Sequence, residues 1–268
     1  MDTSILPNKK YIIVTDAIMY FVEYINSIFK NYDNVSARNF KVCYKESMIS
    51  INNDIDNVKY IINMEQCNDK NIELWLSKGK IVLNYNLYHI NKIKNENHLY
   101  LPYQINIEET SKLGKFCQTK KEYDVVICSV NSKRRSNIYY DLYKRGVNVK
   151  NVKGWGDNRD IEIGKGKILL NIHFNDEYKI NESLRCDRWA TSGLLVITEN
   201  SKDDNDLDIK ELLIIEKYEK LVDKIIEVLS DYNRYYKEYM EKLLEKIESI
   251  RELRNVEMKK VLEKIEYG

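Results

Sequence analysis

The chain has 268 residues, of which 43% are hydrophobic and 32% charged, so the composition indicates a globular protein rather than a disordered one. Its 43 Lys and Arg residues nearly balance its 42 Asp and Glu residues, which argues against a general polyanion-binding surface and predicts no nucleic-acid partner. The five cysteines include no CxxC pair, the start lacks signal-peptide character, and no apolar run approaches the roughly 20 residues of a membrane span, so we expect a reduced, cytoplasmic protein.

In the first part of the chain, short apolar runs of strand length alternate with amphipathic stretches. Strands are predicted at residues 10–15, 40–44, 60–64, 80–85 and 98–101, and helices at 17–28 and 71–77. This alternation is typical of a mainly parallel sheet with helices on both faces. His89 and His98 are expected to be ordinary surface or loop residues.

The pattern restarts after a polar segment at residues 108–121, which we interpret as a linker. Strands are then predicted at residues 124–130, 147–152, 167–172 and 193–198, and helices at 136–144 and 180–189. Two such units in series predict an α/β fold of two lobes with a cleft between them.

The C-terminal segment from about Ile209 to Glu266 contains neither Gly nor Pro and is predicted to be helical. Five apolar residues follow a 4-3-4-3 spacing that makes a narrow stripe: Tyr236, Met240, Leu243, Ile247 and Ile250. One interpretation is a helix packed back on the chain's own α/β units, or one stabilised by solvated charge pairs. The other is a helical hairpin or a coiled-coil contact in a homodimer.

Lys167–Asn200 contains the densest group of residues that could carry chemistry. A strand leads to His173 at its carboxyl end, and a helix follows that Asn181 could cap. Glu182, Arg185 and then Arg188 or Trp189 would share one face of this helix. Open α/β sheets bind ligands at this edge, helix N-termini favour anions, and a carboxylate there can accept hydrogen bonds from ribose hydroxyls.

A second candidate is the basic turn VNSKRRSN at residues 130–137, directly after the first strand of the second unit. Lys133, Arg134 and Arg135 converge where a helix is expected to start, and the arginine fork suits phosphate. The alternative is a solvated basic turn. The sequence has neither a Walker A motif nor GxGxxG, and its acidic run at residues 203–208 lacks metal-binding context, so we predict no metal site.

These stretches resemble the donor-binding half of GT-B glycosyltransferases, and more narrowly the small spore-maturation-like glycosyltransferases of giant DNA viruses. The phrases YIINMEQ (60–66), IVLNYN (81–86) and YLPYQI (100–105) share the resemblance, which spans roughly residues 10–230. It implies two Rossmann-like units facing a cleft: an acceptor-side domain at 1–115, a nucleotide-sugar-binding domain at 116–208, and a helical tail at 209–268.

The resemblance also implies roles for individual residues. His173 would face the donor sugar or diphosphate, Glu182 would contact the ribose, and Arg185 would support the phosphates or hold Glu182. The remaining implied contacts are to the diphosphate and the base, from Ser132, Arg134, Arg135 and Trp155. In common GT-B enzymes the ribose glutamate lies about five residues before the Gly that precedes the last strand. Counting back from Gly193 reaches Arg188, beside Asp187, so Asp187 competes with Glu182 for the ribose.

The first unit would bind the acceptor and supply a base, either Glu65 or Asp16, each at the end of a predicted strand. The alternatives are that Asp16 caps the next helix and that Glu65 bonds to backbone. The predicted function is metal-independent transfer of a sugar, without a further cofactor, from UDP- or GDP-sugar to a hydroxyl of a glycan, protein or small molecule. The competing hypotheses are a nucleotide-sugar-binding module without transfer activity and an interaction protein that acts through its helical tail.

Overall fold

A computed structural model describes residues 12–14, 40–43, 59–63, 69–154, 156–177 and 179–267. Contacts divide the chain into two compact units, one of residues 1–104 with 254–268 and the other of residues 105–253. The predicted boundary at 115/116 falls inside a helix at Ile107–Cys117, which the division at 104/105 assigns whole to the second unit. Among the helices that the structure describes, none has the length and apolar character needed to cross a bilayer.

The first unit contains a parallel five-stranded sheet in the order β1-β2-β3-β4-β5. Its strands are β1 (Ile12–Val14), β2 (Phe40–Cys43), β3 (Tyr60–Asn63), β4 (Ile81–Asn84) and β5 (His98–Tyr100), joined in part by α3 (Asp69–Ser77) and α4 (Leu87–Lys92). Each predicted strand of this unit is therefore confirmed. The predicted helix at 17–28 lies outside the described residues.

A cluster of buried polar side chains lies at the carboxyl ends of β3 and β4. Asn63 Nδ2 donates to Asn84 Oδ1 at 3.2 Å, and Asn84 Nδ2 lies 3.2 Å from His98 Nε2. His98 Nδ1 lies 3.0 Å from the Ile93 carbonyl, so both ring nitrogens have polar neighbours. His98 and His89 are 5% and 2% exposed, so the prediction that they are surface residues is wrong. Polar partners that allow the burial of an imidazole are not visible in hydrophobic periodicity.

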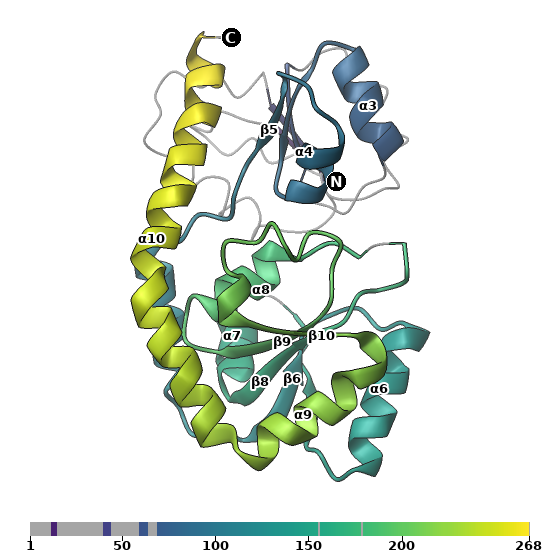
Figure 1. The fold of residues 1–268 in the computed structure, drawn as a ribbon, viewed down its shortest axis with the longest axis vertical. Helices are drawn as coiled ribbons and strands as arrows, with labels where there is room; N and C mark the ends of the chain where they lie inside the picture. Colours follow the sequence, from purple (N-terminus) through teal and green to yellow (C-terminus); the bar gives the residue numbers. More distant parts are fainter. Residues whose placement is uncertain are drawn as a thin grey trace. The chain divides into compact units, whose positions relative to one another are not determined.

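The second unit contains another parallel five-stranded sheet, in the order β10-β9-β8-β6-β7 (Figure 1). Its strands are β6 (Tyr123–Ile127), β7 (Val149–Asn151), β8 (Gly166–Asn171), β9 (Leu195–Glu199) and β10 (Leu213–Glu216). Its helices are α5 (Ile107–Cys117), α6 (Lys133–Lys144), α7 (Asp157–Gly164), α8 (Ser183–Ala190), α9 (Leu221–Ser230) and the first part of α10 (Tyr232–Tyr267). Figure 1 shows α6 and α9 on one side of this sheet and α7 and α8 on the other. The expected mixed α/β fold with parallel sheets and a long C-terminal helix is confirmed.

Helix α5 occupies the segment that we interpreted as a polar linker, and that prediction is wrong. Asn106 caps the helix, since its side-chain oxygen accepts from the backbone N–H groups of Glu108 at 2.9 Å and Glu109 at 3.1 Å. Leu113 and Cys117 are buried in the core of the second unit. An amphipathic helix with a narrow apolar face is easily mistaken for a linker when only its overall polarity is considered.

The C-terminal segment begins with a strand rather than a helix, so the predicted helical tail from residue 209 is wrong at its start. Strand β10 pairs in parallel with β9, with Ile214 opposite Ile197. The run Leu213–Ile215 is apolar and partly β-branched, which favours a strand over a helix, and it adds to the sheet edge that β9 offers. Short 3₁₀ turns flank the strand at Lys210–Leu212 and Tyr218–Lys220.

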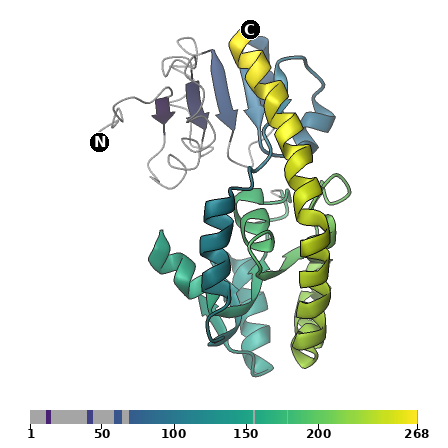
Figure 2. The ribbon, with the colours of Figure 1, turned by 90° about the vertical axis from the view of Figure 1, so that its left-hand side faces the viewer.

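Helix α10 is uninterrupted over 36 residues, as Figure 2 shows. Leu243 and Ile250 of the predicted apolar stripe are buried in the core of the second unit, and the other three residues of the stripe pack against it. Tyr239 Oη donates to the Ala190 carbonyl at 2.6 Å. For this stripe, packing on the chain's own α/β unit is therefore confirmed.

The last turns of α10 belong to the first unit. Arg254, which is 1% exposed, donates through Nη1 to the Tyr103 carbonyl at 2.9 Å. Tyr60 Oη donates to the Ile265 carbonyl at 3.2 Å. One helix thus contributes residues to both units.

The packing of α5 against α7 leaves no room for a side chain at Gly164, where a Cβ atom would lie 2.7 Å from the backbone carbon and oxygen of Phe116. We expect Gly164→Ala to lower the free energy of unfolding by about 1–3 kcal/mol, as overpacking does, measured by urea denaturation. Gly114→Ala on α5 is the matched control, because its Cβ would meet only the Ser192 carbonyl oxygen at 3.5 Å. Alanine favours a helix over glycine by about 1 kcal/mol, so this control should be neutral or stabilising. Equal effects of the two substitutions would contradict the α5–α7 contact.

Candidate functional site

The candidate site lies at the carboxyl edge of the second sheet, where the strand order reverses. The chain passes from β6 to its neighbour β7 on one side and then crosses to β8 on the other side of β6. In open parallel sheets this switch point is the usual place for a ligand. The loop after β6 leads to α6 and the loop after β8 leads to α8, so the structure places both predicted stretches at this edge.

Glu199, the last residue of β9, is the centre of the site and is 0% exposed. Both of its carboxylate oxygens accept from the guanidinium of Arg134, one of them at 2.6 Å. The backbone N–H of His173 donates to Glu199 at 3.1 Å, and Lys179 Nζ lies 3.5 Å away. A buried carboxylate needs this much compensation, so Glu199 draws the β6–α6 and β8–α8 segments toward the end of β9.

Arg134 is fully engaged inside the protein. Its guanidinium lies 3.7 Å from the centre of the Tyr218 ring, and Tyr218 Oη donates to the Arg134 carbonyl at 2.8 Å. Asp176 lies 3.4 Å away, and only 14% of the Arg134 side chain is exposed. Its two terminal nitrogens thus bind a carboxylate of the protein, the same geometry that we predicted for phosphate.

Arg135 clamps two loops through their backbones. Its Nε donates to the Ile172 carbonyl and its Nη1 to the Val130 carbonyl, both at 2.7 Å. Its Nη2 lies 3.7 Å from a carboxylate oxygen of Glu182. The Ser132 hydroxyl caps α6 by accepting from the Arg135 N–H at 3.3 Å. Ser132 and Arg135 therefore set the entry into α6 and join it to the end of β8.

Glu182 forms the exposed end of a polar chain. Its carboxylate lies 2.6 Å from Arg185 Nη1, with the predicted spacing of three residues, and 24% of its side chain is exposed. Arg185 Nη1 also donates to Asn171 Oδ1 at 2.7 Å, and Asn171 Nδ2 donates to Thr198 Oγ1 at 3.0 Å. The chain therefore connects the N-terminus of α8 to the ends of β8 and β9.

Two details of the predicted helix are different in the structure. Glu182, rather than Asn181, is the residue that precedes α8, and no side chain caps the helix. Asn181 instead donates through Nδ2 to Asp187 Oδ1 at 3.1 Å. Arg188 turns away from Glu182 and binds Glu109 at 2.8 Å and Asp160 at 2.6 Å, because these carboxylates on α5 and α7 compensate its burial.

Asp187 and Glu182, the two competing ribose ligands, have different environments. Asp187 is 2% exposed and accepts the hydrogen bond from Asn181, whereas Glu182 has an exposed edge. Of the two, Glu182 is the carboxylate that a solvent-borne ligand can reach in this structure.

His173 is 0% exposed, and its Nε2 lies 3.1 Å from Ser201 Oγ. Its Nδ1 is buried without a hydrogen-bond partner in the described part of the chain. Burial lowers the pKa of His173 below its ordinary value, although the carboxylates of Glu199 and Glu182 oppose this shift. The imidazole is therefore neutral at pH 7 and sits behind the site rather than on its surface. Glu65, Asp16 and Trp155 lie outside the described residues.

Sequence reasoning missed Glu199, Tyr218 and Asn171. A usable signal existed for Glu199, because it ends an apolar strand in the same way as the candidate bases of the first unit. In the part of the chain that the structure describes, no group of His, Cys, Asp and Glu could hold a metal ion.

Comparison with known proteins identifies relatives in a giant virus, while no family model matches the chain. The chain is 30% identical over 270 residues to the uncharacterized protein L138 of Acanthamoeba polyphaga mimivirus, which covers 88% of this chain and 31% of L138. It is 36% identical over 165 residues to the uncharacterized protein L137 of the same virus, with 60% of this chain and 22% of L137 covered. A third mimivirus relative, the uncharacterized protein L140, is 36% identical over 161 residues, or 58% of this chain and 53% of L140. The chain thus spans about half or less of these relatives, and their origin suggests that it is viral-like.

Because Arg134 compensates a buried charge, its removal should destabilise the fold. We expect Arg134→Ala to lower the free energy of unfolding by about 3 kcal/mol, measured by urea denaturation, since it leaves Glu199 buried without its main partner. Lys133→Ala is the control, because Lys133 is an exposed neighbour in the same helical turn and should change stability by less than about 0.5 kcal/mol. Similar small changes in both variants would show that the Arg134–Glu199 pair does not hold the site together.

Asp203, which accepts a hydrogen bond from the Asn181 N–H at 3.0 Å, makes stability depend on pH. Burial raises the pKa of the Asp203 carboxyl to about 6, above its ordinary value of 3.8, although the hydrogen bond from Asn181 opposes the shift. The folded state therefore holds this proton more tightly than the unfolded state. The resulting stabilisation is complete below about pH 4 and is lost as the pH rises through about 6, a change of about 3 kcal/mol. Asp203→Asn should remove this loss of stability at high pH. In denaturation experiments, the free energy of unfolding of the variant, relative to that of the parent, should therefore be higher at pH 7 than at pH 4.5. Asp206→Asn, at an exposed position nearby, should leave the pH profile of the parent unchanged.

Proposed function

We propose that the chain binds a nucleoside-diphosphate sugar at the carboxyl edge of the second sheet and transfers the sugar to an acceptor hydroxyl. The observation that carries this proposal is the Glu182–Arg185–Asn171 chain at the strand-order reversal, with the Glu182 carboxylate partly exposed beside Arg135. A carboxylate held by two guanidinium groups is a fixed acceptor for the two hydroxyls of a ribose.

The diphosphate would lie against the first turn of α6. This helix has 12 residues, so its N-terminus presents free backbone N–H groups and the positive end of its dipole. Lys133 adds an exposed positive charge there. Because the Arg134 side chain is bound to Glu199, we assign it to shaping this turn and the field around it. The same groups would stabilise the diphosphate as it leaves during attack of the acceptor oxygen on the anomeric carbon.

The resemblance to GT-B glycosyltransferases extends the proposal to the first unit, which would bind the acceptor and supply Glu65 or Asp16 as the base. The arrangement of two Rossmann-like units around a cleft belongs to this proposal, as does the choice of a UDP- or GDP-sugar. The mimivirus relatives, which are uncharacterized proteins, support a viral-like origin and a host-cell setting.

Two alternatives lead to different outcomes. A binding module would hold the donor without turnover, so loss of transfer in Glu65→Gln with unchanged donor affinity would argue against it. An interaction protein would act through α10. Since the apolar stripe of α10 packs on its own unit, such a role falls to exposed residues such as Leu244 and Leu253.

The test is a thermal-shift screen of the full chain against UDP, GDP, ADP, CMP and their common sugar conjugates. We expect one nucleoside diphosphate to raise the melting temperature by mass action. Glu182→Ala should then weaken binding about 10- to 100-fold, because it removes hydrogen bonds to a charged acceptor. Glu219→Ala is the control, since Glu219 is exposed in the turn before α9 and should bind as the parent does. Absence of any shift at millimolar ligand, or equal binding by both variants, would refute the proposal.

A further inference from the structure

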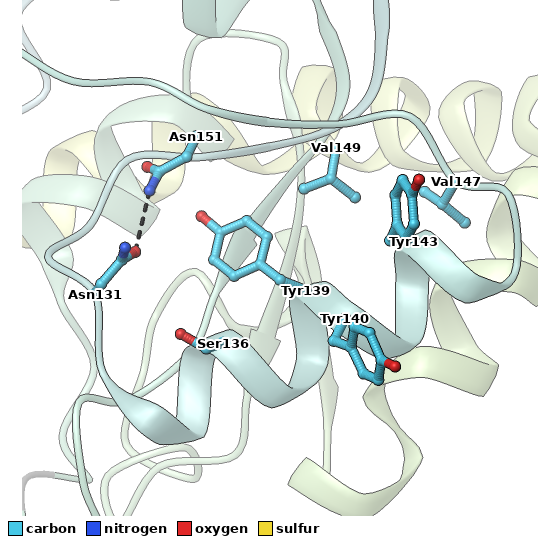
Figure 3. Close-up of a pocket in the computed structure, with 8 residues that line it drawn as sticks. All are labelled: Asn131, Ser136, Tyr139, Tyr140, Tyr143, Val147, Val149 and Asn151. Carbon is cyan, nitrogen blue, oxygen red and sulfur yellow. Dashed lines mark hydrogen bonds between the residues drawn. The ribbon is translucent and has the colours of Figure 1, made fainter.

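A second pocket lies on the second unit between α6 and the edge strand β7, and Figure 3 shows its lining. Its volume is about 440 Å³, within the range of roughly 300–1,000 Å³ that is usual for small-molecule sites. The lining residues are uncharged and come from α6, β7 and the segments beside them: Asn131, Ser136, Tyr139, Tyr140, Tyr143, Val147, Val149 and Asn151. None of these lining residues is among the residues that contact the Glu199 carboxylate, namely Arg134, His173 and Lys179.

The walls of this pocket are aromatic and accessible. Tyr140 and Tyr143 are 59% and 76% exposed, which is unusual for such large apolar rings. Lys144 Nζ covers one face of Tyr140, 4.1 Å from the ring centre. Val147 and Val149 add aliphatic surface close to Tyr143 and Tyr139 (Figure 3). The pocket thus offers flat apolar surfaces to a ligand without a counter-ion among its lining residues.

Two polar atoms of the lining, Tyr139 Oη and Asn151 Oδ1, are buried and have no hydrogen-bond partner among the residues that the structure describes. Asn151 Nδ2 donates to Asn131 Oδ1 at 3.1 Å, and Figure 3 shows the Tyr139 hydroxyl directed toward these two asparagines. Buried tyrosine hydroxyls and amide oxygens normally have partners, since an unpaired one costs stability. Burial also raises the pKa of Tyr139, so its hydroxyl remains a donor.

We propose that this pocket binds the ring of a neutral saccharide. A sugar hydroxyl both donates and accepts, so neighbouring hydroxyls can accept from Tyr139 Oη and donate to Asn151 Oδ1. The C–H face of a pyranose packs flat against an aromatic ring such as that of Tyr143. An apolar ligand would leave both polar atoms unpaired, which favours a ligand rich in hydroxyl groups. The inference is independent of the transfer site: it describes a glycan-docking pocket that can operate with or without sugar transfer.

The experiment uses saturation-transfer NMR on the full chain with maltotetraose, cellotetraose and chitotetraose as probes and uridine as a competitor. We expect at least one tetrasaccharide to bind and uridine not to displace it. Tyr139→Phe should weaken that binding about tenfold through the loss of one buried hydrogen bond, and Tyr143→Ala should weaken it by a similar factor through the loss of a packing face.

Tyr139→Phe should also affect the stability of the protein, in the opposite direction to its effect on sugar binding. It removes a buried hydroxyl that has no partner in the free protein, so the variant should unfold at the same or a higher temperature than the parent while binding sugar less well. Tyr88→Phe, on α4 of the first unit, is the matched control and should leave binding unchanged. Glu182→Ala should also leave it unchanged, which separates this site from the donor site.

Three results would overturn the inference. One is the absence of saturation transfer to all three tetrasaccharides at millimolar concentration. Another is sugar binding that Tyr139→Phe and Tyr143→Ala leave intact. The third is displacement of the sugar by uridine, which would assign the pocket to a nucleoside.

Discussion

A carboxylate removed from solvent is the constraint on which the second unit depends. Glu199 ends a central strand with no exposed surface, and a charge in that position is tolerated only where several donors converge on it. The donors come from Arg134 at the start of α6, from the backbone at His173 after β8, and from Lys179 further along that loop. The two loops at the strand-order reversal are therefore held by this buried charge, together with the hydrogen bonds from Arg135 to the Ile172 and Val130 carbonyls.

The basic residues at this edge bind different partners within the protein. Arg134 compensates Glu199, Arg135 bonds to two backbone carbonyls, and Arg185 positions Glu182 while bonding to Asn171. Most of the positive charge thus orders the protein, and little of it is free to attract a ligand. On the proposed function, affinity for the diphosphate would then rely on backbone N–H groups at the start of α6, whose direction the helix fixes. A site built in this way would be preorganised, so the proposed ligand would not need to order it on binding.

Much of the fold could be predicted because parallel α/β units bury their strands on both faces and leave continuous apolar runs. Each described strand except β10 was predicted from the sequence, as was the position of Glu182 and Arg185 one helical turn apart. The errors share a cause, because they concern segments whose structure is decided by distant partners. Strand β10 forms at the open edge that β9 offers, and α5 gains its place by packing on α7. The Arg134–Glu199 pair joins positions 65 residues apart, which no local pattern reveals.

The sharing of α10 between the two units has a consequence for the order in which the chain can fold. The first unit contains strands made early, yet Arg254 and Ile265 at the far end of the chain bond to Tyr103 and Tyr60 within it. A ribosome delivers those helical turns after residues 105–253. The second unit, whose residues 105–253 form one continuous segment, has all of its core once residue 253 has emerged. During synthesis the second unit can thus be finished before the first, whose sheet waits for the turns of α10 that follow residue 253.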